Sequence, residues 1–180
     1  TTGLHFDDIR MLVVSAAPIA KETLDYFQSL ALPIMEVYGM SECTGPTTMS
    51  LPNRYRLGRA GYALPGTELR VAEDGEVLMR GPHVFKGYYK NEAATRETLD
   101  AEGWVHSGDI GDLDAEGYVR ITDRMKDIII TAGGKNVTPS EFENDLKFSP
   151  YITDAVVIGD KRAYLTAIVM IDQENVEKYA

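Results

Sequence analysis

The chain has 180 residues, with 18 basic against 28 acidic side chains and a formal net charge of −10. That acidic excess repels phosphate, which argues against a general nucleic-acid binder and a polybasic membrane anchor. The hydrophobic content of 44% excludes wholesale disorder, and one cysteine cannot form an internal disulfide. The sequence has no apolar run long enough for a membrane span and no signal-peptide pattern. We therefore expect a soluble, cytoplasmic protein.

Residues 1–48 predict a β-α-β piece. The apolar runs 11–15 and 34–37 are typical of buried parallel strands, and Pro18 opens a helical stretch between them. One face of that helix is expected to carry Ile19, Thr23, Tyr26, Phe27 and Leu30. Parallel strands need neighbours and helices on both faces, and the rest of the chain supplies none. An apolar face is therefore expected to stay exposed or to mediate self-association.

Short alternating runs separated by glycine turns dominate residues 57–123. They predict antiparallel strands at 68–71, 75–80 and 118–121, with a short helix near 91–99. We interpret residues 49–124 as a distorted antiparallel β-barrel.

The pattern changes again after Arg124. An apolar strand is predicted at 127–131, and Thr138 with Glu141 forms a capping-box pattern around Pro139 that starts a helix. The remaining elements are strands at 155–158 and 165–171 and a helix capped by Asp172.

The predicted fold class is α+β. It combines the β-α-β piece, the barrel and a truncated small α+β domain at 125–180, which follows the joint at Arg124. The first two together, 1–124, form part of a larger N-terminal domain.

Two loops lie where ligands bind in open α/β sheets, beyond the carboxyl ends of adjacent strands. The first, residues 15–18, has small side chains at a helix N-terminus, which suits a flat ring or an anion. The second, residues 38–45, offers an aromatic ring, hydroxyls and one carboxylate. These groups suit base stacking, phosphate binding and Mg²⁺ coordination. A simple capped turn remains the alternative.

Asp109 follows Ser107 and Gly108 at the predicted end of a strand. Its two carboxylate oxygens could accept both hydroxyls of a ribose, or they could cap the turn. His106 and Cys43 are interpreted as structural, because no nucleophile–base pairing is visible around either.

One stretch imitates a calcium site. Ligand positions of an EF-hand loop are occupied by Asp112, Asp114, Glu116, Gly117, Tyr118 and Asp123. Its last position is Asp where a bidentate Glu is usual, and its flanks are predicted strands rather than helices. Calcium binding is therefore the weaker interpretation.

The polar, glycine-rich residues 123–136 lie at the joint between the barrel and the last segment. Ile129 stands where a Walker loop needs its first glycine. The joint is either a solvated linker or a hinge that carries Arg124 to a ligand.

Together the chain resembles the adenylate-forming superfamily, and most closely its long-chain fatty acyl-CoA synthetases. The resemblance extends across nearly the whole chain in order. Its motifs are Tyr38-Gly39-Met40-Ser41-Glu42, Leu57-Gly58-Arg59-Ala60-Gly61, Arg80-Gly81-Pro82, Lys86-Gly87-Tyr88-Tyr89, Gly103-Trp104-Val105-His106-Ser107-Gly108-Asp109, Asp123-Arg124-Met125-Lys126-Asp127 and Gly133-Gly134-Lys135-Asn136-Val137. The tail at 157–167 favours the long-chain branch.

The resemblance implies that a fatty acid reacts with ATP to give acyl-AMP, from which coenzyme A then displaces AMP. It places the adenine against Ala17 and Tyr38, the phosphate at Ser41 and Mg²⁺ at Glu42. It also implies that Asp109 binds the ribose hydroxyls, assisted by Arg124. Lys126 matches the hinge, and Gly133 and Gly134 match a loop that approaches coenzyme A. The catalytic assignments are Glu42 and Arg124. The resemblance is also compatible with peripheral membrane contact of the parent enzyme.

Some features depart from the family pattern. Ser41 stands where threonine is commoner, and Asp123 stands where glycine usually precedes Arg124. The family's phosphate loop is expected before Thr1 and its catalytic lysine beyond Ala180. The resemblance therefore implies a fragment that is inactive by itself. The alternatives are an aryl or peptide-synthetase adenylation domain and a non-catalytic calcium-binding module.

Overall fold

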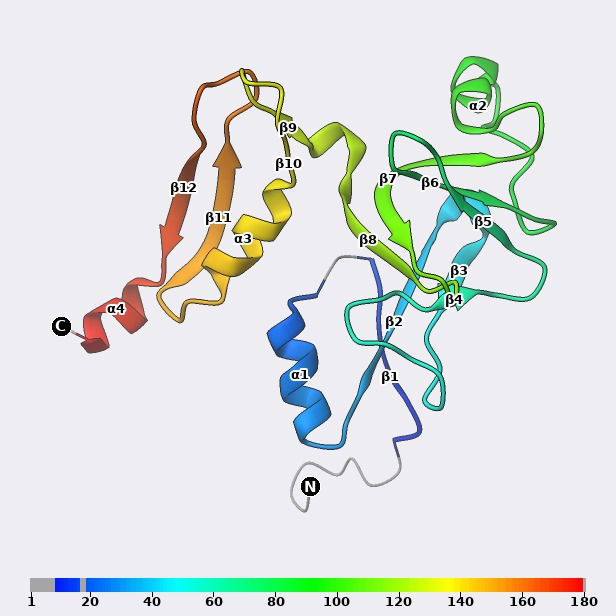
Figure 1. The fold of residues 1–180 in the computed structure, drawn as a ribbon. Helices are drawn as coiled ribbons and strands as arrows, with labels where there is room; N and C mark the ends of the chain where they lie inside the picture. The colour runs from blue at the N-terminus through cyan, green and yellow to red at the C-terminus, as the bar shows by residue number, and fades with distance from the viewer. Residues whose placement is uncertain (1–8, 17–18, 180) are drawn as a thin grey trace. The chain divides into compact units, whose positions relative to one another are not determined.

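A computed structural model describes residues 9–16 and 19–179. The chain divides into two compact units, Thr1–Ile121 and Thr122–Ala180 (Figure 1). Both units mix helices with small, mostly antiparallel sheets, so the predicted α+β class is confirmed. None of the helices in the described part of the chain is long and apolar enough to cross a membrane.

The first sheet of unit 1 has the order β1-β2-β3-β4. β1 (Leu12–Val14) pairs in parallel with β2 (Ile34–Met40), and α1 (Lys21–Ser29) connects them, as predicted for a β-α-β piece. The predicted helix face is wrong in part. Leu24 is the fully buried side chain of α1, whereas Tyr26 is 61% exposed. Pro18, the predicted helix start, lies outside the described residues, and α1 has Ala20 as its N-cap.

The second loop predicted as a ligand site is not a loop throughout. β2 continues to Met40, a 3-10 turn η1 spans Ser41–Cys43, and β3 (Gly45–Met49) returns antiparallel along β2. β4 (Tyr62–Ala63) pairs with β3 at the edge. The register shifts where Gly39 faces Pro46, and proline is tolerated in a sheet at such an irregularity.

The second sheet of unit 1 has the order β5-β6-β7-β8. Its strands are β5 (Glu68–Val71), β6 (Glu76–Arg80), β7 (Val105–Leu113) and β8 (Val119–Arg124). β5 and β8 form its two edges, so this part of the predicted barrel is a curled sheet. An isolated bridge between Tyr62 and Tyr118 joins it to the first sheet. α2 (Glu92–Thr98) is capped by Asn91, whose Oδ1 accepts from the Ala94 N–H.

A buried core joins the turn after β2 to the second sheet. Cys43, Met79 and Val105 form this cluster, and Tyr38 and Met40 pack against it. Cys43 is therefore a packing residue, as predicted, and burial raises the pKa of its thiol. The strand that carries Tyr38 is held against the strand that carries Asp109 by apolar contacts between their neighbours.

Unit 2 contains a 3-10 turn η2 (Met125–Asp127) and two small hairpins. β9 (Ile129–Ile130) pairs with β10 (Asn136–Val137), and β11 (Ile152–Ile158) pairs with β12 (Thr166–Ile171). Figure 1 shows α3 (Pro139–Lys147) lying along β11. α4 (Gln173–Tyr179) is capped as predicted, because Asp172 Oδ1 accepts from the Asn175 N–H at 3.0 Å.

The predicted capping box of α3 is wrong. Thr138 occupies the N-cap position but makes no side-chain cap bond. The Ser140 N–H instead lies 3.5 Å from Asp123 Oδ2, and the Ser140 hydroxyl donates to the Thr122 carbonyl. A carboxylate from a preceding strand thus takes the place of the helix's own cap.

Candidate functional site

The site in unit 1 is built around a hydrogen bond between Tyr38 on β2 and Asp109 on β7. The Tyr38 hydroxyl donates to Asp109 Oδ2 at 2.8 Å, and Asp109 is only 6% exposed. Burial, and then the charge of Asp109, raise the pKa of Tyr38 far above its usual range. The phenol therefore remains a protonated donor, which stabilises the carboxylate beside it.

Asp109 lies within β7 and not at a strand end as predicted. Between Leu78 and Glu76, β6 advances two residues while β7 advances four, from His106 to Ile110. Ser107, Gly108 and Asp109 form this bulge, and Gly108 adopts φ +68°, which favours glycine. Bulges beside functional sites commonly redirect a side chain.

Side chains satisfy the backbone groups that the bulge removes from the ladder. The Ser107 hydroxyl donates to the Val77 carbonyl at 2.6 Å, and the Asp109 N–H donates to Ser107 Oγ at 3.0 Å. Glu76 Oε1 accepts from the Gly108 N–H at 2.8 Å. The conformation leading into Asp109 is thus fixed by two neighbouring side chains.

The turn after β2 presents Ser41 and Glu42. Ser41 is exposed and Glu42 is half-buried. The Tyr88 hydroxyl donates to Glu42 Oε1 at 2.5 Å, and this hydrogen bond raises the pKa of Tyr88. The Phe85 N–H also donates to the Glu42 carbonyl at 2.7 Å. Residues 83–88 therefore brace the turn, an arrangement that the sequence analysis missed.

The donor set at this turn fits a metal ion that arrives with its substrate. Among residues 9–16 and 19–179, no three His, Cys, Asp or Glu side chains form a group that could enclose an ion. Mg²⁺ in nucleotide enzymes is held by one or two carboxylates together with the substrate's phosphates. Glu42 offers one carboxylate at this turn.

The EF-hand-like stretch is a β-hairpin whose carboxylates are paired with arginines. Asp112 accepts from Arg59 at 2.7 Å and from Arg120 at 2.7 Å. Arg56 pairs with both Asp114 and Glu116. The flanking elements are β7 and β8, so the helices that position an EF-hand loop are replaced by strands.

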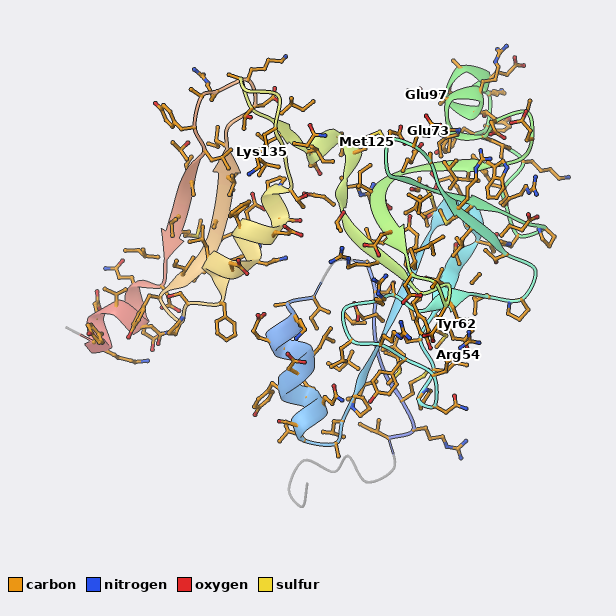
Figure 2. All side chains as sticks on the ribbon, viewed as in Figure 1. Arg54, Tyr62, Glu73, Glu97, Met125 and Lys135 are labelled. Atoms are coloured by element: carbon orange, nitrogen blue, oxygen red, sulfur yellow. The ribbon has the colours of Figure 1, made fainter. Side chains whose placement is uncertain are left out.

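Cation–aromatic contacts also stabilise this hairpin. The Arg54 guanidinium lies 3.8 Å from the centre of the Tyr62 ring, and Arg56 lies 4.8 Å from that of Tyr118. Figure 2 shows Arg54 and Tyr62 side by side at the edge of the first sheet. Arg56 thus contacts both the Tyr118 ring and the Asp114 carboxylate, so ring and ion-pair contacts stabilise the same hairpin.

The remaining predicted site residues belong to unit 2 or lie outside the residues that the structure describes. Arg124 ends β8, and Lys126 is exposed in η2. Gly133 and Gly134 form the tip of the β9–β10 hairpin, where an added Cβ would meet no atom within 4 Å. Gly134 adopts φ +76°. Ala17 lies outside the described residues.

Sequence reasoning also missed Glu76. The signal was a single acidic residue at the start of the otherwise apolar run 76–79, a position where an unpaired carboxylate would be costly.

Comparisons with known proteins agree with this architecture. Residues 3–89 match the AMP-binding enzyme family, and residues 126–179 match the AMP-binding enzyme C-terminal domain. The chain belongs to the AMP-binding, or adenylate-forming, enzyme family.

Within that family the chain is similar to fatty acyl-CoA ligases. It is 46% identical over 178 residues to a Mycobacterium tuberculosis protein named as a fatty-acid–CoA ligase, covering 98% of this chain and 31% of that protein. It is 43% identical to a long-chain-fatty-acid–CoA ligase of Xenopus laevis, covering 94% of this chain and 24% of that one. The chain thus spans about a third or less of these relatives.

A solved structure shares the fold. O-succinylbenzoate–CoA synthetase from Bacillus subtilis, in complex with its acyl-adenylate intermediate, superposes with a TM-score of 0.85 at 28% identity. That match covers 96% of this chain and 39% of the synthetase.

Proposed function

We propose that this chain carries the nucleotide-binding and hinge segment of an ATP-dependent long-chain fatty acid–CoA ligase. In the first half-reaction a fatty carboxylate oxygen attacks the α-phosphorus of ATP, forming acyl-AMP and releasing pyrophosphate. In the second, the coenzyme A thiol loses its proton, its sulfur attacks the acyl carbon, and AMP leaves. The 2.8 Å hydrogen bond between Tyr38 and Asp109 carries this proposal, because it unites two nucleotide motifs at one site.

The adenosine is assigned to the surface that these two residues form. The Tyr38 ring is proposed to stack on adenine, with Ala17 against the same base. A carboxylate has about four lone-pair sites, so Asp109 can accept from Tyr38 and from ribose hydroxyls together. Charge-assisted hydrogen bonds of this kind give both affinity and discrimination.

The phosphates are assigned to the turn after β2. Ser41 is proposed to donate its hydroxyl to a phosphate oxygen. Glu42 would hold Mg²⁺, which supplies charge neutralisation on the phosphates when bound. Tyr88 already fixes one carboxylate oxygen of Glu42, so the carboxylate is oriented before ATP arrives.

Unit 2 is proposed to supply the part that changes between half-reactions. Arg124 would assist at the ribose and Lys126 would act as the hinge between domains 1–124 and 125–180. Gly133 and Gly134 would approach coenzyme A, which suits a hairpin tip without side chains. A cytoplasmic location and peripheral membrane contact belong to the same proposal.

An acid panel tests the function in a full-length ligase carrying this segment. We expect pyrophosphate release to depend on a long-chain fatty acid and thioester formation to depend on coenzyme A. Preference for an aryl acid or an amino acid would favour the other adenylate formers. Saturable calcium binding without acid-dependent turnover would favour the non-catalytic module.

A further inference from the structure

The buried carboxylate of Glu76 has a role that the nucleotide motifs do not include. Glu76 is the first residue of β6 and is only 7% exposed. Its Oε1 accepts from the Gly108 N–H at 2.8 Å, and its Oε2 lies 2.7 Å from His106 Nδ1. An acidic side chain this buried is costly unless it is hydrogen-bonded, and both oxygens of Glu76 have a partner.

Gly108 lies in the bulge that leads into Asp109, and His106 is the last paired residue of β7 before it. β7 has two more residues than β6 between the paired positions, so the Gly108 N–H cannot donate to a regular partner across the ladder. The side-chain carboxylate of Glu76 accepts from the Gly108 N–H instead. The adjacent peptide carries Asp109, whose own N–H is held by Ser107.

We propose that Glu76 is a positioning residue that fixes the Ser107–Asp109 bulge and thereby directs the Asp109 carboxylate toward the ribose. Glu76 acts through Gly108 and His106 and does not contact the nucleotide. This inference rests on the proposed function, because it gives the reason for the position of Asp109 in that function.

The backbone conformation of Gly108 also depends on the hydrogen bond to Glu76. Gly108 adopts φ +68°, and an added Cβ there would meet no atom within 4 Å. The side of Gly108 on which a Cβ would stand is therefore open and gives the peptide no packing support. The hydrogen bonds of Glu76 and Ser107 and the ladder on either side hold it, so loss of the Glu76 bond should loosen Asp109 more than the rest of β7.

The test compares ribose discrimination among variants of a full-length ligase carrying this segment. The variants are Glu76→Ala, Glu76→Gln, Asp109→Ala and the double variant Glu76→Ala with Asp109→Ala. The matched control is Glu68→Ala, which removes an exposed carboxylate paired with Arg80 on the neighbouring strand β5. The substrates are ATP, 2′-deoxyATP and 3′-deoxyATP, and circular dichroism confirms that each variant is folded.

Glu76→Ala is expected to reduce the kcat/KM preference for ATP over the deoxy analogues by about five- to twentyfold, mainly through KM. Glu76→Gln keeps an acceptor for Gly108 and should restore most of the preference. The double variant should lose no more preference than Asp109→Ala alone, because both changes act on the same contact between Asp109 and the ribose. Glu68→Ala should behave like the unmodified enzyme.

If Glu76→Ala lowers kcat/KM equally for ATP and for both deoxy analogues, the positioning role is overturned. In that case Glu76 would support the fold alone, and the proposed function would stand. A preference that survives in Asp109→Ala would instead overturn the ribose assignment, and the positioning role with it. If Glu76→Ala does not fold, Glu76→Asp decides, since it withdraws the carboxylate by one methylene. An unchanged preference in folded Glu76→Asp would overturn the proposal.

Discussion

The Tyr38 hydroxyl on β2 donates to Asp109 Oδ2 on β7 across 2.8 Å, although 71 positions separate the two residues in the chain. Each residue comes from a different motif, and only the folded unit brings them together. The contact lies beside the core of Cys43, Met79 and Val105, so the two strands cannot separate without exposing that core.

Removal of either partner should weaken nucleotide binding. In a full-length ligase carrying this segment, Asp109→Ala should lower ATP affinity about ten- to a hundredfold, because it removes charge-assisted hydrogen bonds. Tyr38→Phe keeps the ring and should lower ATP affinity about three- to tenfold. Calorimetric titration with ATP measures both. Affinities within twofold of the unmodified enzyme would argue against the adenosine site. Tyr26→Phe, at an exposed side chain of α1, is the control and should leave the ATP affinity unchanged.

The Tyr88–Glu42 hydrogen bond predicts a specific metal phenotype. Tyr88→Phe removes only the hydroxyl that donates to Glu42 Oε1. We expect the Mg²⁺ concentration for half-maximal adenylation to rise about three- to tenfold, since the carboxylate loses its fixed orientation. Tyr89→Phe is the matched control, because Tyr89 is the next residue and is 87% exposed. An equal shift in both variants, or in neither, would contradict the prediction.

The arginine-paired carboxylates predict a loss of stability in acid. Burial alone would raise the pKa of Asp112, but hydrogen bonds from Arg59 and Arg120 outweigh it and hold the pKa below its ordinary value of 3.8. The resulting stabilisation is fully present above about pH 4 and is lost as pH falls through the lower folded pKa. Urea unfolding of the chain should show Asp112→Asn to be less stable at pH 6.

The difference between the two proteins should shrink as the pH falls below 3.8 and through the lower pKa of Asp112 in the folded chain, because the carboxylate is then protonated in both states. A difference that stays constant across this range would mean that the ion pairs contribute nothing that depends on charge. The absolute effect is expected to be modest, because the side chain of Asp112 is 39% exposed.

The hinge proposal predicts that Lys126→Pro separates the half-reactions. Proline fixes φ near −65° and disfavours the helical region for Met125, which is the first residue of the η2 turn. In the full-length enzyme, adenylation should be largely retained while thioester formation falls. Lys126→Ala keeps backbone freedom and serves as the control. Equal loss of both half-reactions in folded Lys126→Pro would count against a hinge.

Gly133 offers a test of the coenzyme A assignment with little risk to the fold. Its added Cβ would meet no atom within 4 Å, and it lacks the positive φ of Gly134. Gly133→Ala should therefore leave the thermal stability of the chain unchanged. If the hairpin tip approaches coenzyme A, the same change should slow thioester formation by about tenfold or more and spare adenylation. Unimpaired thioester formation would remove the assignment.

Local patterns predicted the elements whose structure is set locally. The hairpin of β5 and β6 follows from alternation and a turn at Gly75, which adopts φ +89°. The helix α2 follows from its Asn91 cap. β3 was missed because Gly45 and Pro46 are typical of turns, whereas its pairing with β2 is fixed by tertiary contacts.

Contacts between distant segments could not be predicted in the same way. The cap of α3 comes from Asp123, a residue that departs from the family pattern, and Thr138 has no cap bond. The site itself was predicted as separate residues through a family resemblance. Its supports, Glu76 and Tyr88, contact residues 32 and 46 positions away, and no spacing rule relates them.

The central claim is that Tyr38 and Asp109 hold the adenosine of a fatty acyl-adenylate. The most direct measurement is calorimetric titration of a non-hydrolysable long-chain acyl-AMP analogue into a full-length ligase carrying this segment, compared with its Asp109→Ala variant. The account predicts one saturable site per chain whose affinity falls about ten- to a hundredfold in the variant. Absence of binding to the unmodified enzyme, or equal affinity in the two proteins, would contradict it.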